Sequence, residues 1–313
     1  MQSLWMVVAA LFFAGYGVFI KLSGGEGIGS WEILFFRSIF GVFVFYVMLR
    51  LAGGTVYTSH PWHHIVRSLC GTSAIVAGIY SISHLNLGLA MTLNYTAPLF
   101  VGTYVAVTSI AHHQRMNFGL MSTVITGFVG VVVLLGPTIG PNEYFASVVG
   151  LSAGMFTAIA TTFVKKLGLL KEPEARIIFY LVLVGAVVGF IGVILTGGFH
   201  AWSWTSALYI LLLCICATMG QFCLTRAFSR GNIILSSALL YTVILFATID
   251  GVIIFGEPVS ITGVLGMIII VLSGFFATYF VRRENARRFE AKPKNPRFEK
   301  IEIHSSREDK RKY

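Results

Sequence analysis

Residues 177–195 read IIFYLVLVGAVVGFIGVIL, a run of nineteen residues without one charged side chain. An α-helix rises about 1.5 Å per residue, so about twenty apolar residues cross the roughly 30 Å hydrocarbon core of a bilayer. A run of this length and composition is therefore predicted to be a transmembrane helix.

Similar apolar runs occur along most of the chain. Hydrophobic residues make up 56% of the 313 residues and charged residues only 12%, whereas a typical soluble domain has about 25% charged residues. The predicted fold class is therefore an all-α membrane protein with ten transmembrane helices. These are expected near 3–22, 31–50, 66–84, 87–110, 118–136, 144–164, 175–196, 205–226, 232–255 and 259–281.

The basic residues are distributed unevenly over the connections between these runs. The connections 23–30, 85–86, 137–143, 197–204 and 256–258 contain no Lys or Arg. The C-terminal tail is basic, and the alternate connections, counted with the span ends that border them, hold Arg50, Arg67, Arg115, Lys165, Lys166, Lys171, Arg176, Arg226 and Arg230. This asymmetry is what the positive-inside rule describes, and one missing or extra helix would invert every later loop. We therefore predict a multi-pass protein of the cell inner membrane with both termini in the cytoplasm.

The formal net charge of +10 is concentrated at the C-terminal end. The segment after Val281 holds twelve Lys+Arg and six Asp+Glu, a surplus of six. A basic segment beside a membrane favours contact with anionic lipid headgroups. We therefore expect membrane lipid, and no nucleic acid, as the partner of these charges.

The second half of the chain repeats the first at an offset of about 144–146 residues. Tyr95-Thr96, for example, aligns with Tyr241-Thr242. Each half contains five predicted helices, and an odd number turns the second half upside down, as in transporters built from inverted repeats. We predict a first repeat over 1–137, a second repeat over 138–281 and a basic cytoplasmic tail over 282–313.

Residues 80–100, YSISHLNLGLAMTLNYTAPLF, resemble the third-to-fourth helix signature of EamA-type carriers of the drug/metabolite transporter superfamily. Arg37 and Gly256-Glu257-Pro258 also resemble that family's pattern. The resemblance covers residues 1–281 and implies the ten-helix, two-repeat layout. It also implies a carrier for metabolites such as amino acids, nucleobases, vitamins or S-adenosylmethionine. The first half departs from the pattern, with His112-His113 where Gly-Glu is usual.

Polar side chains inside the predicted spans indicate a binding site, because they need hydrogen-bond partners in lipid. Asn94 and Tyr95 fall near the middle of the membrane, and Pro98 leaves a carbonyl near Asn94 without its backbone donor. A substrate or a neighbouring helix could supply the partners, and both alternatives stay open. The expected substrate-binding residues are Tyr80, Asn94, Tyr95, Thr96, Gln221 and Tyr241.

Ionisable side chains within spans are costly and usually functional. Arg37 and Asp250 fall at similar depth in the outer third of the membrane, so they form an ion pair or an external gate, or each reaches the outer interface separately. Glu32 and His84 lie nearer the outer surface, where they titrate during proton coupling or are simply solvated. These four residues are the expected gating or coupling groups.

The favoured function is a secondary transporter that moves a small organic metabolite, amino-acid-like or related, by alternating access. The sequence contains no nucleotide-binding loop, zinc-protease pair or nucleophile elbow, so we expect no catalytic residues, metal or cofactor. The alternatives are a lipid-type flippase, a non-transporting receptor and a membrane-embedded enzyme.

Overall fold

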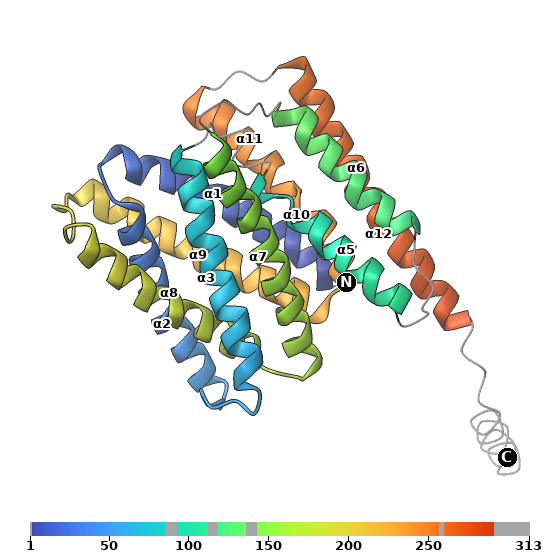
Figure 1. The fold of residues 1–313 in the computed structure, drawn as a ribbon, viewed down its shortest axis with the longest axis horizontal. Helices are drawn as coiled ribbons and strands as arrows, with labels where there is room; N and C mark the ends of the chain where they lie inside the picture. The colour runs from blue at the N-terminus through green and yellow to red at the C-terminus, as the bar shows by residue number, and fades with distance from the viewer. Residues whose placement is uncertain (1, 85–92, 112–117, 136–142, 257–259, 291–313) are drawn as a thin grey trace, which may run out of the picture.

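The computed structural model describes residues 2–84, 93–111, 118–135, 143–256 and 260–290, and every regular element in these ranges is a helix (Figure 1). The helices are η1 (Gln2–Leu4), α1 (Trp5–Gly25), α2 (Ser30–Leu51), α3 (Pro61–His84), α5 (Ala97–Ala111), α6 (Phe118–Leu135), α7 (Tyr144–Leu169), α8 (Glu174–Leu195), α9 (Trp204–Arg230), α10 (Ile233–Leu240), α11 (Thr242–Phe255) and α12 (Ile261–Glu290).

Seven described segments are long and apolar enough to cross a membrane, with α10 and α11 counted together as Ile233–Phe255. The helix α3 begins with polar residues, α6 contributes a shorter apolar stretch, and the fourth predicted span is described only from residue 93. The expected all-helical membrane fold is thus confirmed. Two boundaries differ from the prediction, because the ninth span is two helices and the tenth continues to Glu290.

One end of the helical bundle carries the N-terminus, and we call it the terminal side. The backbone N–H of Asn232, between α9 and α10, donates to Ser3 Oγ beside the N-terminus at 2.9 Å. Arg230, at the end of α9, pairs with Glu174, at the start of α8, at 2.5 Å. The N-terminus and the connections α7–α8 and α9–α10 therefore meet at this end.

The other connections divide in the same alternating way. The α2–α3 connection joins the terminal side, because Arg176 Nε donates to the carbonyl of Thr55 at 2.8 Å. The connections α1–α2 and α8–α9 meet at the opposite end, the far side, where the backbone N–H of His200 donates to Glu32 Oε1 at 2.5 Å. This alternation agrees with the distribution of basic residues along the sequence.

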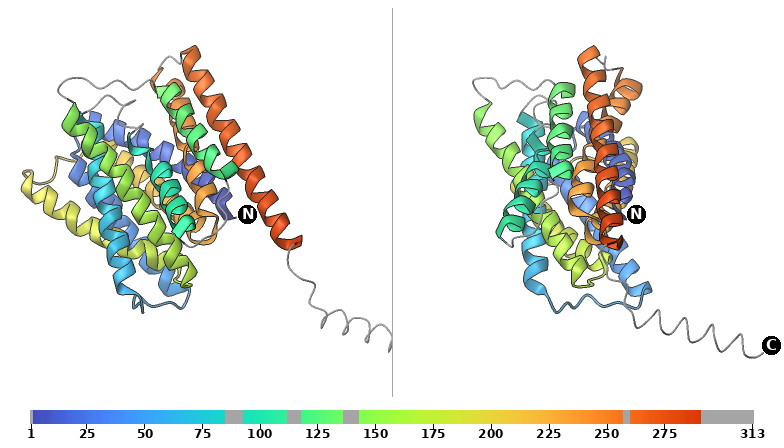
Figure 2. Two further views of the ribbon diagram at one scale, coloured as in Figure 1. Left: turned by 45° about the vertical axis from the view of Figure 1, so that its right-hand side comes forward. Right: turned by 90° about the vertical axis from the view of Figure 1, so that its right-hand side faces the viewer.

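The helix contacts relate the two halves by an approximate two-fold axis. The first half contributes α1, α2, α3, α5 and α6, and the second contributes α7, α8, α9, the α10–α11 pair and α12. The contact of α1 with α9 is matched by that of α7 with α3, and α1 with α11 is matched by α7 with α5. The equivalent helices α2 and α8 pack on each other, as do α6 and α12, which lie side by side at one edge (Figures 1 and 2).

Both repeats interrupt one span at the same Tyr-Thr pair. In the first, a turn at Tyr95 and Thr96 precedes α5, and Thr96 Oγ1 donates to the carbonyl of Leu93 at 2.6 Å. In the second, α10 ends before Tyr241, and Thr242 Oγ1 donates to the carbonyl of Leu239 at 2.7 Å. The threonine hydroxyl thus satisfies a carbonyl three residues back at each break, as a hydroxyl can where helical bonds are lost.

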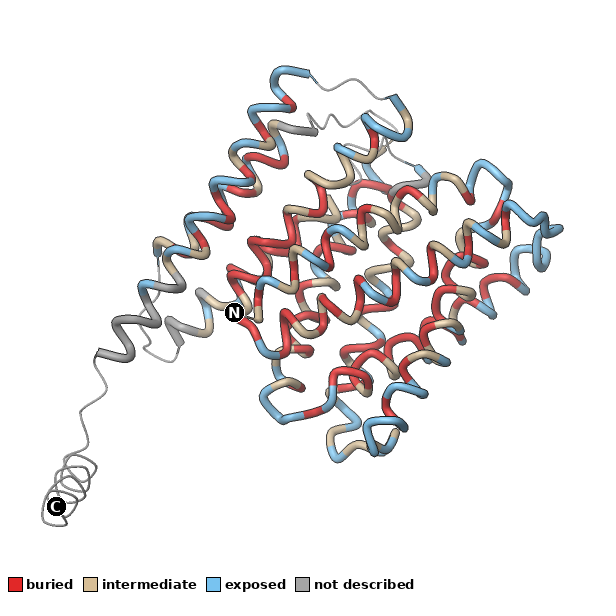
Figure 3. The backbone as a smooth tube through the Cα atoms, turned by 180° about the vertical axis from the view of Figure 1, so that it is seen from behind, coloured by how far each residue is buried: buried red, intermediate tan, exposed pale blue. Residues whose placement is uncertain are grey.

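Glycines on α8 bring it close to α2. A Cβ added at Gly189 would lie 2.7 Å from the backbone nitrogen of Phe35, and one at Gly185 would lie 2.7 Å from Ser38 Oγ. The Gly-x-x-x-Gly spacing therefore serves close helix approach, as small residues do in membranes. Outward faces of the peripheral helices are instead exposed (Figure 3), including the large apolar side chains of Phe43, Val187, Ile253 and Phe275 that suit contact with lipid.

We expect Gly189→Val to destabilise the bundle strongly, because its branched side chain would overlap the α2 backbone, which cannot yield as a side chain can. The loss should reach at least the 1–3 kcal/mol typical of overpacking. Thermal unfolding in detergent measures the effect. The control is Gly24→Ala, since nothing lies within 4 Å of a Cβ at Gly24; equal midpoints for the two variants would contradict the prediction.

Candidate substrate cavity

A cavity of about 630 Å³ lies between the two halves, within the size range of ligand pockets. It is bounded by α1, α2, α3 and by the residues just before α5 from the first half, and by α7 to α11 from the second. Its lining is mostly apolar, with a limited set of polar side chains. These are Tyr16, Lys21, Arg37, Arg67, Asn94, Tyr95, Thr157, Thr161 and Gln221.

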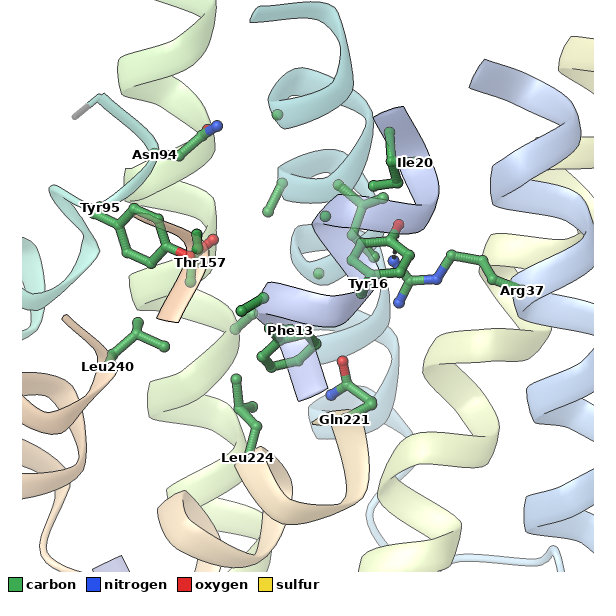
Figure 4. Close-up of a pocket in the computed structure, with 18 of the residues that line it drawn as sticks. Phe13, Tyr16, Ile20, Arg37, Asn94, Tyr95, Thr157, Gln221, Leu224 and Leu240 are labelled. Atoms are coloured by element: carbon green, nitrogen blue, oxygen red, sulfur yellow. Dashed lines mark hydrogen bonds between the residues drawn. The ribbon is translucent and has the colours of Figure 1, made fainter. Parts of the chain in front are cut away.

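Arg37 enters the cavity from α2 and meets Tyr16 of α1 (Figure 4). Its Nη1 donates to the Tyr16 hydroxyl at 2.9 Å, and its guanidinium carbon lies 5.0 Å from the centre of the Tyr16 ring. The side chain is buried. The phenol thus holds the guanidinium by a hydrogen bond and by its ring face, while supplying no negative charge.

Arg67 lies on a face of α3 that otherwise carries small residues. Arg67, Gly71, Ala74 and Gly78 all line the cavity and recur at the spacing of one helical face. A Cβ at Gly71 would overlap Arg67 Nη1, so the missing side chain there makes room for the guanidinium. Arg67 is only 3% exposed, and its Nε has no hydrogen-bond partner in the described part of the chain.

Asn94 and Tyr95 approach the cavity from the break before α5, on the side away from Arg37 (Figure 4). Asn94 Nδ2 donates to Ser81 Oγ at 3.4 Å, whereas Asn94 Oδ1 is buried and has no partner among the described residues. The amide therefore presents an unused acceptor. Gln221 of α9 is also buried, and its Nε2 donates to Thr225 Oγ1 at 3.3 Å.

A packed apolar layer separates the cavity from the terminal side. It is formed by side chains from α1, α7, α8, α9 and α10, including Met6, Leu167, Ile177, Phe228 and Leu235. At the other end, the cavity lining reaches the far ends of α1 and α11, where Lys21 Nζ lies 4.1 Å from the centre of the Phe255 ring. In this conformation the cavity therefore extends toward the far side.

A second cavity of about 540 Å³ lies at the far side, between the start of α2, the end of α3 and the α8–α9 connection. It collects three of the predicted residues, Glu32, Tyr80 and His84, together with His200. The Tyr80 and His84 rings stack with centres 4.0 Å apart. Glu32 is buried, and its Oε2 has no partner in the described ranges.

Of the ten predicted site residues, Arg37, Asn94, Tyr95 and Gln221 line the central cavity, but three others line neither cavity. Tyr241 is fully buried and donates to the carbonyl of Val124 at 3.3 Å. Thr96 is packed against Gly154 and caps its own turn. Asp250 is partly exposed on α11.

The predicted ion pair between Arg37 and Asp250 is absent from this structure. Arg37 bonds instead to Tyr16, because α1 packs on α11 while α2 packs on α8 and α9. The prediction also missed Arg67, which it assigned to an inner connection. Its helical spacing to the small residues at 71, 74 and 78 was the available signal.

A buried polar cluster closes the terminal side between the α2–α3 connection and the start of α8. Glu172 accepts from Arg176 Nη1 at 2.6 Å and from Thr58 Oγ1 at 2.5 Å. Fully buried His64 has its Nε2 3.7 Å from Glu172 Oε2, and its ring centre lies 4.7 Å from that of Tyr180. The cluster thus ties the two halves together.

The pKa values of this cluster depend on its burial. Burial lowers the pKa of His64 to about 4, against the opposing effect of Glu172. Burial would raise the pKa of Glu172, but hydrogen bonds from Thr58 and Arg176 and the nearby positive charges outweigh it, so that pKa is lowered. His64 is therefore neutral and Glu172 ionised near neutral pH. Within the described ranges no three His, Cys, Asp or Glu residues gather closely enough to hold a metal ion.

Comparison with known families matches both halves of the chain. The model of the EamA-like transporter family matches residues 1–136 and again residues 145–279. A solved crystal structure superposes with a TM-score of 0.77 at 16% identity, covering 90% of this chain and 98% of the other. At that identity the superposition supports the fold alone.

Three relatives are transporters by name. The pseudopaline exporter CntI of Pseudomonas aeruginosa is 25% identical over 85% of this chain and 92% of its own length. The S-adenosylmethionine uptake transporter of Rickettsia felis is 24% identical over 92% of this chain and 95% of its own. The riboflavin transporter of Brucella anthropi is 23% identical over 57% and 62%, respectively.

We expect the terminal-side cluster to lose stability in acid. The pKa of His64 in the folded protein lies below its unfolded value of about 6.5. The stability of the folded protein is therefore complete above that value and falls as the pH approaches the folded pKa. At pH 5 the free energy of unfolding should be lower by about 2 kcal/mol. The lowered pKa of Glu172 acts in the same direction at lower pH. When the pH is lowered from 7.5 to 5, the melting temperature of the wild type should therefore fall further than that of His64→Phe. Parallel profiles would contradict the assignment.

Proposed function

This chain belongs to the EamA-like transporter family, and we propose that it moves a small, amino-acid-like organic metabolite across the cell inner membrane by alternating access. Its relatives by name transport small metabolites. The observation that carries the proposal is the central cavity, which both repeats line and which a packed apolar layer separates from the terminal side.

Reciprocal contacts at the two ends of the bundle support the alternating movement. On the far side, Glu32 at the start of α2 holds the α8–α9 connection through His200. On the terminal side, Arg176 at the start of α8 holds the α2–α3 connection through Thr55. The repeat exchanges these two arrangements, so each end has an equivalent place to open or close, which alternating access requires.

The orientation we propose puts the terminal side in the cytoplasm. Arg50, Lys165, Arg176 and Arg230 all lie at this side, whereas the far-side connections that are described contain no Lys or Arg. Excess basic residues favour the cytoplasmic face. We assign no direction of transport, because the named relatives include an exporter and an uptake transporter.

Counterflow in liposomes tests the proposal. Purified protein is reconstituted into vesicles loaded with an isotopically labelled amino-acid mixture, and exchange against external metabolites is followed. We expect saturable exchange, and we expect Gln221→Leu to reduce it about tenfold, because one buried hydrogen-bonding group contributes about 1–2 kcal/mol. Thr126→Val is the matched control, since Thr126 is exposed on α6 and bonds to its own helix.

Other outcomes of the same preparation would overturn the proposal. Flipping of a fluorescent phospholipid without metabolite exchange would favour a flippase, and chemical conversion of a metabolite would favour an enzyme. Labelling a cysteine introduced at Arg50, from one side of right-side-out membranes, reports the orientation.

We further propose that Glu32 carries the coupling proton, since its Oε2 is buried without a described partner and faces a cavity shared with His84 and His200. Glu32→Gln should abolish acceleration of transport by a pH gradient while leaving counterflow intact. The control is His63→Gln, because His63 lies at the start of α3 on the terminal side and lines neither cavity. Undiminished gradient-driven transport by Glu32→Gln would refute this role.

A further inference from the structure

The central cavity has an unbalanced charge. Its described lining includes the buried guanidinium groups of Arg37 and Arg67 and no carboxylate. Arg37 and Arg67 come from neighbouring elements of the chain, α2 and α3, and both are more than nine-tenths buried. A buried guanidinium needs a compensating negative charge or a full set of acceptors, because removing it from water is costly.

The nearby acidic residues are committed elsewhere. Glu172 pairs with Arg176, and Glu174 pairs with Arg230. Glu32 faces the far-side cavity and accepts from His200. None of these three carboxylates lines the central cavity, and neither does Asp250.

The two arginines differ in how far the protein satisfies them. Arg37 makes one hydrogen bond, to a neutral phenol. Arg67 makes none to the described residues, and its Nε is buried without a partner. Gly71 leaves room for the Arg67 guanidinium at the cavity wall. Since a guanidinium offers five donors in a planar fork suited to a carboxylate, each arginine retains donors for one carboxylate.

The other lining residues indicate which further chemical groups the ligand carries. Asn94 Oδ1 is an acceptor without a described partner, which suits an ammonium group. Phe13, Leu224 and Leu240 supply an apolar wall near Gln221 and Tyr95 (Figure 4). A ligand here therefore combines anionic groups with a cationic or donor group and an apolar part.

We propose that the transported metabolite is an amino acid derivative with two carboxylates, one bound by Arg37 and the other by Arg67. This inference rests on the proposed transport function and specifies the charge of its substrate. The two carboxylates supply the negative charge that the described cavity lining lacks. In the empty carrier the same two guanidinium groups remain uncompensated, so the site is stabilised by its substrate.

The first test needs no knowledge of the substrate. If the charge of Arg67 is compensated only by a bound ligand, Arg67→Met should raise the melting temperature of the empty protein by about 2 °C or more, because it removes an unpaired buried charge. Arg50→Met, at the exposed end of α2, is the matched control and should not change it. A lower melting temperature for Arg67→Met, or a failure to fold, would make Arg67 a packing residue and overturn the proposal.

The second test measures binding with matched ligand pairs. The pairs are aspartate and asparagine, glutamate and glutamine, and the dipeptides Asp-Phe and Asn-Phe, each differing by one carboxylate. Because a bound ligand raises the melting temperature, we expect at least one diacid to do so at concentrations at least tenfold below its amide. Arg37→Gln and Arg67→Gln should each weaken binding of that diacid about thirtyfold or more. Arg37→Lys and Arg67→Lys should each retain part of the affinity, and Arg50→Gln should leave the affinity unchanged.

The outcomes separate this inference from the proposed function. If the amides stabilise the protein as strongly as the diacids do, or if no diacid stabilises it, the proposal of a dicarboxylate substrate is overturned. Counterflow of only neutral or cationic metabolites also overturns it, while leaving the carrier function intact. Diacid binding that depends on both arginines but drives no flux would support the site and overturn the carrier function.

Discussion

A bilayer provides no water for backbone groups, so every peptide hydrogen bond in the span must be made within the protein. This constraint explains why every regular element in the described part of the chain is a helix, and why its two helix breaks are so alike. At each break a threonine hydroxyl satisfies a carbonyl three residues earlier. The first break lies at Tyr95 and Thr96, directly after Asn94, and both Asn94 and Tyr95 line the cavity beside it.

Most of the fold could be predicted from the sequence because the membrane simplifies the signals. Apolar length marks the spans, and basic loops mark their direction. The splitting of the ninth span at Tyr241 could not be predicted, because no proline or glycine stands there and the cap is a hydroxyl bond. The repeat alignment of Tyr95-Thr96 with Tyr241-Thr242 held the necessary information, but only the structure shows that both pairs are breaks.

The site was less predictable, because depth along a helix says little about which neighbour a side chain meets. Arg37 and Asp250 share a depth, yet α1 stands beside α11, and Arg37 meets Tyr16 instead. From the sequence alone, Arg67 is counted with an inner connection, although the small residues that follow it at helical spacing place it on a cavity-lining face. Asn94, Tyr95 and Gln221 are predicted because a buried amide or phenol in lipid needs a hydrogen-bond partner, and all three line the central cavity.

The two tyrosines at the breaks, Tyr95 and Tyr241, occupy equivalent positions in the repeat but have different surroundings. Tyr95 borders the cavity, whereas Tyr241 is sealed against α6, its ring seated over Gly127 and its hydroxyl bound to a carbonyl. The copy at 241 is thus held by packing on all sides, and few other residues would fit. The copy at 95 is only partly buried, because it packs against apolar clusters and also borders the cavity. Of one repeated motif, one tyrosine therefore borders the space between the halves, while the other fixes a contact between them.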